Sequence, residues 1–488
     1  MDISIYASED TKKYIMDGIQ IFSDSIKSDY LDVAYLENGI IIPVEHPFGT
    51  KGVGGVVDEK GKIHDYSLRN NTIFTDNYTR YQSSYEYYGA NPDTNLKNVK
   101  YINEEIMFLG VGFNQFDYGH TILESLGRLW YLLDKDASKY KVALLSPPSK
   151  DCIDLLILFG IVEENIITIT EPTKYRNVII PQTSISIVFY FNIKFKEIID
   201  RISDKIEPYN FEKVYFSKKN IYYKRNLHEK PLQDVFRNNG YKIFYPEKLS
   251  VKEKIAIVKG CKYYAGFNGS NIVHSVFAKE GANIICLLRC NDEPYESYLN
   301  MHNNNIILVT SNNLSLPISR WAGPYIVCGN EYLFKFFDDY NFKYNKKSFL
   351  YNNYQILDYI FIWSQIFKED LVLKKPSNVI QISNEQIANN IVKIYYNYMK
   401  ENTLYKNTGF FIGITTEVGN VNYNNYFEIV IFGIRIIKID LNKYSILKKI
   451  SWWIPIRKLR DNFRNKFVYY YPPKDEYKNY FIDKVLNK

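Results

Sequence analysis

Residues 261–288 have the sequence CKYYAGFNGSNIVHSVFAKEGANIICLL, and this stretch decides the fold that we predict. Its first part predicts a strand over Cys261–Ala265, followed by a glycine-containing loop over Gly266–Gly269. A helix is then expected over Ser270–Lys279, and a second strand over Asn283–Leu288. A strand, a tight turn, a helix and another strand form the repeating unit of a parallel α/β sheet.

The same alternation continues toward the N-terminus, in two blocks separated by a long helix near Ile193–Ile206. Two such blocks in tandem predict two facing Rossmann-like domains with a cleft between them. The nearer block has expected strands at Val214–Ser217 and Tyr241–Tyr245 and helices at Pro231–Asn238 and Val251–Lys259; the farther block has expected strands at Ile106–Val111, Val142–Leu145, Ile166–Ile169 and Val178–Ile180 and helices at His120–Leu133 and Asp151–Phe159.

Both ends of the chain depart from this alternation. The first hundred residues contain short β-like runs at Ile40–Val44 and Gly54–Val57, and the part beyond about residue 340 predicts a helix at Asn384–Lys400 and a hairpin of Phe410–Thr416 with Tyr426–Ile439. The expected domains are therefore 1–205, 206–340 and 341–488, the last being a mixed α/β appendage.

Composition is that of an ordinary folded protein. Of the 488 residues, 46% are hydrophobic and 24% charged, which excludes a mainly disordered or collagen-like chain. The net charge of +7 is too small to indicate nucleic-acid binding by itself. The N-terminus lacks the pattern of a signal peptide, and no apolar run is long enough to predict a membrane-spanning helix. The five cysteines have no metal-ligand spacing and favour reduced, buried thiols in a cytosolic protein: Cys152, Cys261, Cys286, Cys290 and Cys328.

A second informative segment is DYGHTILESLGRLWYLL, residues 117–133. On a helix, His120, Glu124 and Arg128 recur at four-residue spacing, opposite an apolar stripe of Ile122, Leu126, Leu129 and Leu133. The polar side is either a solvated face with a Glu124–Arg128 ion pair or the lining of a cleft. In a cleft, His120 is the candidate general base, because an unperturbed imidazole titrates near neutral pH; Glu124 and then Asp117 would orient it or replace it.

Two stretches indicate where an anion would bind. The turn Gly266–Ser270 directs backbone N–H groups toward one point at a helix start, which suits a diphosphate, although such turns are often only tight connections in which a residue like Ser270 caps the helix. Residues 214–229, VYFSKKNIYYKRNLHE, carry Ser217 and a group of cations after a strand. The cations either neutralise a leaving pyrophosphate or form a solvated basic loop: Lys218, Lys219, Lys224 and Arg225.

Taken in order, these stretches resemble glycosyltransferase family 61 over about residues 100–290. The G-H-x-x-x-E-S-L-x-R-L-W segment of the family is matched by Gly119, His120, Glu124, Ser125, Leu126, Arg128, Leu129 and Trp130. Its later motifs are matched by Ser217, Lys218, Arg225 and Glu229, by Pro246, Glu247, Leu249 and Ser250, and by Gly266, Gly269, Ser270 and Phe277. The chain departs from the family at Asn268, where His is usual, at His274, where Asn is usual, and at Lys218, which lacks the bidentate fork of the usual Arg.

The resemblance implies a GT-B architecture, with an acceptor-side domain at 1–205 and a donor-binding domain at 206–340. It also implies an inverting hexosyl- or N-acetylhexosaminyl-transferase that needs no metal and no cofactor besides its nucleotide-sugar substrate, a UDP-sugar. The acceptor would be a glycan or a lipid-linked glycan of a bacterial capsule or lipopolysaccharide, and nucleic acid is not an expected partner. The implied catalytic residues are His120, Glu124 and Asp117, and the implied donor-binding residues are Ser217, Lys218, Arg225, Glu247, Gly266, Asn268, Gly269, Ser270 and Asn271. The alternatives from other classes are a catalytically silent sugar- or nucleotide-binding subunit and a peripheral membrane-binding protein.

The C-terminal tail concentrates the positive charge. Residues 443–466 contain eight Lys and Arg side chains and one Asp, a net charge of +7 that equals the charge of the whole chain. Trp452 and Trp453 lie among these cations, which is typical of a segment at an anionic membrane surface, and Pro455 divides the segment. The alternative is a closing element whose aromatic side chains pack on the protein while its cations stay in water. A cytoplasmic protein held at the inner membrane face is therefore one expectation.

Overall fold

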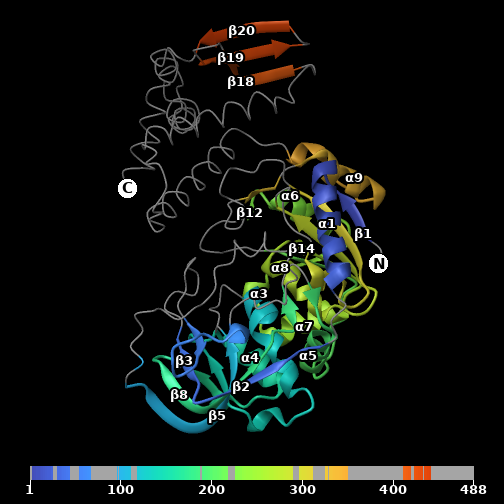
Figure 1. Ribbon diagram of the computed structural model, residues 1–488. Coiled ribbons are helices and arrows are strands. Elements are labelled where there is room, and N and C mark those ends of the chain that lie inside the picture. The colour runs from blue at the N-terminus through green and yellow to red at the C-terminus, as the bar shows by residue number, and fades with distance from the viewer. Residues whose placement is uncertain are drawn as a thin grey trace, which may run out of the picture. The chain divides into compact units, whose positions relative to one another are not determined.

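The chain forms two units, Met1–Leu350 and Tyr351–Lys488 (Figure 1). This computed structural model describes residues 3–25, 30–43, 54–67, 96, 98–110, 118–186, 190–217, 226–289, 296–311, 325–327 and 329–349, and the strands 410–418, 423–431 and 434–440. The expected helix Asn384–Lys400 and the basic tail 443–466 lie outside the described residues.

One sheet of the first unit has six parallel strands in the order β1-β16-β15-β14-β11-β13. Such strands are buried on both faces, which explains why a run such as Asn283–Leu288 is apolar almost throughout. The strands are β1 (Ile3–Tyr6), β11 (Lys213–Phe216), β13 (Lys242–Phe244), β14 (Tyr263–Phe267), β15 (Asn283–Leu288) and β16 (Asn305–Thr310). The helices along them are α6 (Lys230–Asn238), α7 (Val251–Gly260), α8 (Ser270–Val273) and α9 (Glu331–Asp339).

Two details differ from the expected elements around β14. The strand runs from Tyr263 to Phe267 instead of Cys261 to Ala265, because its pairing with β15 continues through Gly266 and Phe267. Gly266 is therefore a strand residue and not part of the turn. The following helix is also shorter than expected, since α8 has four residues and continues only as a 3₁₀ turn over His274–Phe277.

The strand order of this sheet reverses between β11 and β14. From β11 the chain goes to β13 at one edge, then returns to β14 on the other side of β11, and β15 and β16 follow in order. In an open parallel sheet, ligands bind beyond the carboxyl ends of the strands at such a switch point. The residues that follow Phe216 and Phe267 occupy that position here.

The other sheet of the first unit is mixed. Its strands β8, β5, β6 and β7 are parallel, whereas β2 and β3 pair antiparallel with β8, and β4 pairs antiparallel with β3. The strands are β2 (Val33–Glu37), β3 (Ile40–Ile42), β4 (Gly55–Val57), β5 (Lys100–Gly110), β6 (Val142–Leu144), β7 (Ile166–Thr168) and β8 (Thr173–Pro181). The expected α/β fold is thus confirmed, with an antiparallel part that the alternation of strands and helices did not predict.

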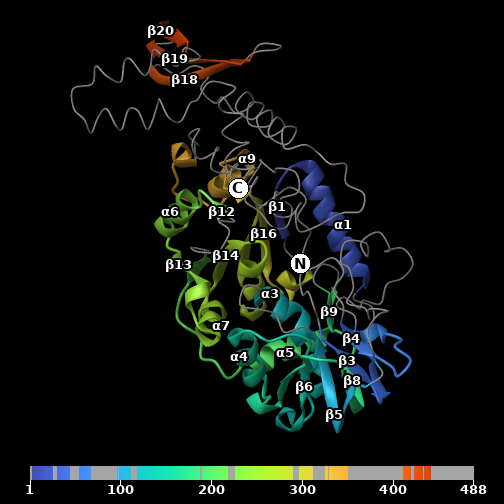
Figure 2. The ribbon, with the colours of Figure 1, turned by 90° about the vertical axis from the view of Figure 1, so that its left-hand side faces the viewer.

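A single apolar cluster connects the two sheets. It contains residues of α4 (Lys150–Phe159), α5 (Ile193–Ser203) and α7 together with strand residues of both sheets. Figures 1 and 2 show these helices between the sheets. Lys254 of α7 and Asp151 of α4 form an ion pair of 2.5 Å across this layer. A separate cluster lies under α6 and α9 on the opposite face of the parallel sheet.

The N-terminal segment contributes to the parallel sheet and to the apolar cluster between the two sheets. Strand β1 pairs with β16, so it extends the parallel sheet although it precedes every strand of the mixed sheet in sequence. Helix α1 (Glu9–Ser25) then contributes Ile15 and Ile19 to the shared cluster. The domain limits 1–205 and 206–340 remain a prediction. Strand β1 lies within the first of these ranges in sequence but pairs with β16, which lies within the second.

The second unit contains a three-stranded antiparallel sheet of β18 (Phe410–Val418), β19 (Tyr423–Ile431) and β20 (Ile434–Asp440). The sequence predicted one strand over Tyr426–Ile439, and this is wrong because the segment contains two strands. Gly433 lies between them in the sequence, and glycine commonly marks such an interruption. Within the described residues, no helix is both long and apolar enough to cross a membrane.

Candidate active site

The segment that carries His120 is helical but irregular. Tyr118–His120 form one α-helical turn, Thr121–Ser125 a π-helical turn and Leu126–Leu132 a 3₁₀ stretch, where the sequence predicted one regular helix. Ile122 and Leu126 are buried on one side, and on the polar side Glu124 and Arg128 are buried while His120 is partly exposed. π-Helical turns are rare in proteins, and those that occur often lie at functional sites. The interpretation of a solvated polar face is therefore wrong.

His120 and Glu124 contact each other across this π turn. The Nδ1 atom of His120 lies 2.5 Å from Oε1 of Glu124. The glutamate side chain is only 6% exposed, whereas the imidazole is 39% exposed. A buried carboxylate next to a partly exposed imidazole is the arrangement that orients a histidine base and stabilises its protonated form.

Arg128 contacts the mixed sheet and the turn beside it. Its Nη2 atom donates a hydrogen bond of 2.9 Å to the carbonyl of Tyr66, and its guanidinium lies 5.3 Å from the ring centroid of Phe108. The Glu124–Arg128 ion pair, one of the two alternatives for the polar side, is not found between these two described residues; Arg128 contacts the mixed sheet and its neighbouring turn instead. Arg128 anchors the helical segment, and His120 takes the position beside Glu124.

Asparagine side chains shape the switch point of the parallel sheet. Asn271 Nδ2 donates a hydrogen bond of 2.9 Å to the carbonyl of Phe216, and this bond connects the start of α8 to the end of β11. Asn268 Oδ1 accepts a hydrogen bond of 2.8 Å from the backbone N–H of Gly269. Both side chains are buried, and these contacts hold the backbone of the turn in place. Their observed role is to position Gly269 and Ser270.

The histidine segment and the glycine turn lie against each other. The Tyr118 ring stacks on His274, with centroids 4.6 Å apart, and Lys254 Nζ lies 4.5 Å from the centroid of the same Tyr118 ring. A β-carbon on Gly119 would lie 3.4 Å from Cα of Ser270. The absence of a side chain at Gly119 therefore lets the residue before His120 touch the turn. Two segments about 150 residues apart in the sequence thus meet, as 120 and 270 show.

The other expected site residues differ in what surrounds them. Ser217 is fully buried, and its Oγ atom accepts a hydrogen bond of 2.8 Å from Gln233 Nε2. Glu247 is exposed in a 3₁₀ turn beyond the carboxyl end of β13, at the same edge of the sheet. Asp117, Lys218 and Arg225 lie outside the described residues.

A buried glutamate, Glu229, lies next to Ser217. Glu229 Oε1 accepts a hydrogen bond of 2.6 Å from the hydroxyl of Tyr215, and both residues are buried. Burial raises the pKa of the Glu229 carboxyl above its ordinary value, although hydrogen bonds from Tyr215, Ser217 and Gln233 oppose the shift. These side chains hold the carboxyl end of β11 in place beside the candidate site.

Sequence reasoning missed Arg289. This residue follows directly after β15, and its guanidinium lies over Gly269 of the turn. The available signal was a cation immediately after a buried parallel strand, at the edge of the sheet where ligands bind. The contact itself depends on the pairing of β14 with β15, which the sequence does not state.

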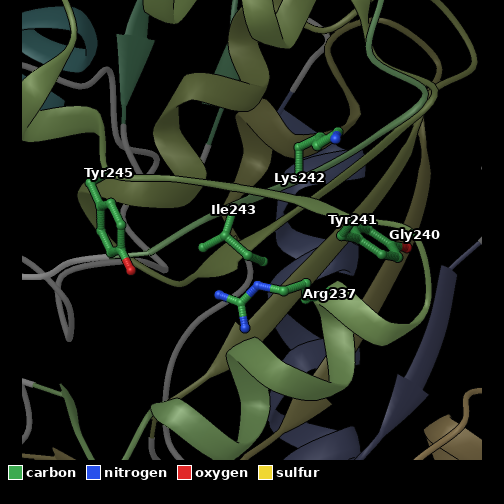
Figure 3. Close-up of a pocket in the computed structure, with 6 residues that line it drawn as sticks. All are labelled: Arg237, Gly240, Tyr241, Lys242, Ile243 and Tyr245. Atoms are coloured by element: carbon green, nitrogen blue, oxygen red, sulfur yellow. The ribbon is translucent and has the colours of Figure 1, made fainter.

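A pocket of about 350 Å³ lies elsewhere, along the edge strand β13 (Figure 3). Figure 3 shows the Arg237 side chain extending from α6 alongside Ile243 of the strand. The lining contains none of the expected site residues: Arg237, Gly240, Tyr241, Lys242, Ile243 and Tyr245. We therefore assign the candidate site to the switch point and not to this pocket.

The described residues include histidines and carboxylates that could bind metal, and three of the five cysteines. In that part of the chain, no three His, Cys, Asp or Glu residues are grouped to hold a metal ion. The buried state expected for the cysteines is confirmed for Cys152, Cys261 and Cys286, while Cys290 and Cys328 lie outside the described residues. Burial raises the pKa of the Cys152 and Cys261 thiols to about 12, so these two stay protonated at neutral pH.

The fold and the site together define an α/β protein with a histidine–carboxylate pair beside the switch point of a parallel sheet. Comparison with protein families identifies the region more closely, because residues 118–285 match the model of the family Glycosyltransferase 61. This match supports the resemblance to glycosyltransferase family 61 that the motifs predicted, and with it a glycosyltransferase activity. The matched region begins at Tyr118 and ends within β15, so it contains both segments of the candidate site. No curated protein matches the chain.

Proposed function

We propose that the protein transfers a hexosyl or N-acetylhexosaminyl group from a UDP-sugar to a hydroxyl of a glycan acceptor, with inversion at the anomeric carbon. The observation that carries this proposal is the His120–Glu124 pair next to the Gly269–Ser270 turn, inside the region that matches the family. A base and a donor-binding turn must be adjacent in such a reaction, because the acceptor attacks the carbon that is bonded to the leaving diphosphate.

The reaction would proceed in one displacement. The acceptor oxygen forms a bond to the anomeric carbon while the bond from that carbon to the diphosphate oxygen breaks, and the leaving UDP keeps the electron pair. The acceptor proton passes to His120, through Nε2 because Glu124 contacts Nδ1. Glu124 would stabilise the imidazolium that forms. A positioned base contributes roughly 10²–10⁴ to the rate.

The donor is assigned to the parallel sheet, beyond the carboxyl ends of β11 and β14. Of the proposed donor contacts, Ser217, Asn268, Gly269, Ser270 and Asn271 follow those strand ends in the sequence. Gly266 is the last residue but one of β14, and Glu247 lies at the same edge of the sheet. Because α8 has only four residues, the favourable field there would come from cations more than from a helix dipole. Lys218 and Arg225 remain proposed contacts of the diphosphate, and Asp117 remains a third candidate for the base.

The biological setting is also a proposal. The resemblance and the basic tail favour a metal-independent GT-B enzyme of bacterial capsule or lipopolysaccharide synthesis. It would work in the cytoplasm, at the inner membrane face, on a glycan or lipid-linked glycan. An acceptor attached to a membrane would favour an enzyme whose tail, 443–466, binds anionic lipid.

The test uses purified full-length protein and a panel of nucleotide sugars. We expect slow release of UDP from one UDP-sugar without acceptor, and faster release when a glycan acceptor is added. His120→Ala should lower turnover at least about a hundredfold and leave UDP affinity within about twofold, because the base acts only on the acceptor proton. Glu124→Gln should lower turnover less than His120→Ala does.

The matched control is His302→Ala, which removes a histidine whose Nε2 lies 2.7 Å from the Val276 carbonyl, away from the pair. It tests whether loss of a histidine outside the pair is enough to reduce turnover. Turnover that survives His120→Ala but fails in Glu124→Gln would reverse the two roles. A protein that binds UDP and never releases it from any sugar would instead be the silent binding subunit.

A further inference from the structure

Arg289 lies at the carboxyl end of β15, next to the switch point. Strands β14 and β15 are parallel, and Phe267 pairs with Leu287 at the end of their ladder. The backbone N–H of Asn268 donates to the Leu287 carbonyl at 2.9 Å, so the ladder extends one residue past the end of β14. Gly269 lies two residues after Phe267, and Arg289 lies two residues after Leu287. The pairing of the sheet therefore delivers this arginine to the glycine turn.

The guanidinium lies against Gly269. A β-carbon built on Gly269 would lie 3.1 Å from Nη2, 3.3 Å from Nη1 and 3.4 Å from Cζ of Arg289. Gly269 also has a φ of +90°, which residues with a side chain rarely adopt. The glycine thus serves two purposes, since it makes the turn and leaves space for a cation against the backbone.

The arginine also contacts an aromatic ring. Its guanidinium carbon lies 4.7 Å from the ring centroid of Tyr325, a residue of the short strand β17 (Tyr325–Ile326) that pairs with β12 (Asn226–Leu227). Arg289 is only 7% exposed. Burying a guanidinium has a large desolvation cost, and stacking on an aromatic ring offsets part of it while fixing the plane of the group.

His120, the Gly269–Ser270 turn and Arg289 form a continuous series of neighbours. His120 adjoins Gly119, Gly119 contacts Ser270, and Gly269 contacts Arg289. In the proposed reaction the anomeric carbon must lie near His120, and the next group along the donor is the β-phosphate. We propose that Arg289 binds the β-phosphate of the nucleotide donor and stabilises the leaving diphosphate. This assignment rests on the proposed function for its reaction, but its binding part can be measured without sugar transfer.

The experiment measures binding by calorimetry to full-length protein. UDP, GDP, ADP and CDP are compared with the matching monophosphates, and the tightest diphosphate with its monophosphate is used for the variants. Arg289→Gln should weaken the diphosphate about 10- to 100-fold, the usual effect of losing a charge-assisted contact, and the monophosphate less than about threefold. Arg289→Lys should recover only part of this loss, because lysine keeps the charge without the planar fork.

The matched control is Arg237→Gln. Arg237 is a partly exposed arginine that pairs with Asp234 on α6, away from the turn, and its loss should leave both affinities unchanged. Gly269→Ala provides a second route, because the added methyl group occupies the space of the guanidinium. It should reproduce the selective loss of diphosphate affinity. Retained monophosphate binding shows that a variant is folded.

The outcomes separate the two proposals. Equal losses for diphosphate and monophosphate, or no loss in either Arg289 variant, would overturn the assignment of Arg289 while leaving the proposed transfer reaction intact. Selective loss together with an absence of sugar transfer in the unmodified protein would support Arg289 and refute the proposed function. If the unmodified protein binds none of the diphosphates, both proposals are wrong.

Discussion

Two buried glutamates in this protein have different partners, and their chemistry differs accordingly. Glu124 contacts the imidazole of His120, which can carry a positive charge and so can compensate a buried carboxylate. Glu229 receives a hydrogen bond from the neutral hydroxyl of Tyr215, and burial raises its pKa. The first arrangement suits proton transfer. The second suits a structural carboxyl group behind Ser217.

Glu229→Gln tests the second role through the pH dependence of stability. A carboxyl whose pKa is raised on folding stabilises the native state fully below the unfolded pKa, and this contribution is lost as pH rises through the folded value. Glutamine does not titrate. The free energy of unfolding of Glu229→Gln relative to the unmodified protein should therefore increase as pH rises from about 4 to 7, the range above the ordinary glutamate pKa. Urea unfolding at several pH values measures it.

Glu253→Gln is the matched control because it has the opposite sign. Glu253 caps α7 through hydrogen bonds with Ser250, and these bonds lower the pKa of its carboxyl. Its contribution to stability is present above the unfolded pKa and is lost as pH falls through the folded value. Parallel pH dependences in the two variants would contradict the assignment for Glu229.

At the scale of elements, the irregular segment over 118–132 is determined by close approach to its neighbours. The carbonyl of Gly127 accepts hydrogen bonds from the backbone N–H and the hydroxyl of Ser184, at 2.8 and 2.6 Å. Trp130 Nε1 donates a hydrogen bond of 2.7 Å to the Gln182 carbonyl. A regular amphipathic helix would need no such bonds. Here they hold the segment that presents His120 against the chain beyond β8.

Gly127→Ala should destabilise the protein and reduce turnover. The added β-carbon would lie 2.6 Å from Oγ1 of Thr183 and 3.0 Å from Cγ2 of Ile185, so the segment must move. Overpacking of this kind typically costs about 1–3 kcal/mol. We expect turnover to fall by about tenfold or more, because a displacement of His120 disturbs the reacting geometry. Denaturant unfolding and steady-state assays measure the two effects.

Thr183→Ala provides the companion variant, since it removes the atom nearest to the added methyl group. The Gly127→Ala/Thr183→Ala protein should regain part of the stability lost in Gly127→Ala, which appears as a favourable coupling in the double-mutant cycle. Strict additivity of the two single changes would show that the contact with Thr183 is not the cause.

At the scale of the whole molecule, the charge distribution separates two regions of the chain. The net charge of residues 443–466 equals that of the entire protein, so the remainder is neutral in total. Nucleotide binding is assigned to the unit Met1–Leu350, whereas the basic aromatic segment belongs to the other unit. Binding to donor and binding to membrane should therefore be separable.

We expect the full-length protein to co-sediment with anionic liposomes at low salt and to dissociate as salt screens the charge. A chain truncated after Asp440 should lose most of this binding and keep its UDP affinity within about twofold. Replacing the Lys and Arg residues of 443–466 by Gln is the control that keeps the length of the chain. Undiminished sedimentation of both variants would exclude a membrane role for the tail.

Local sequence determined much of this protein. The apolar runs Asn283–Leu288 and Val142–Leu145 predicted strands because a buried parallel strand must be apolar along its length. The four-residue spacing of His120 and Glu124 predicted their contact, since helical residues four apart lie on one side. The family match over residues 118–285 also follows from sequence alone.

Tertiary structure decided what depends on contacts between distant residues. The pairing of β1 with β16, the mixed sheet around β8 and the burial of Arg128 are not determined by any local pattern. The position of Arg289 over Gly269 follows from the register of β14 and β15, and a shift of one residue in that register would separate them. Periodicity identifies which residues are buried within an element, because it reflects one local backbone geometry. Which elements pair, and in what register, is decided only when their side chains pack in a common core.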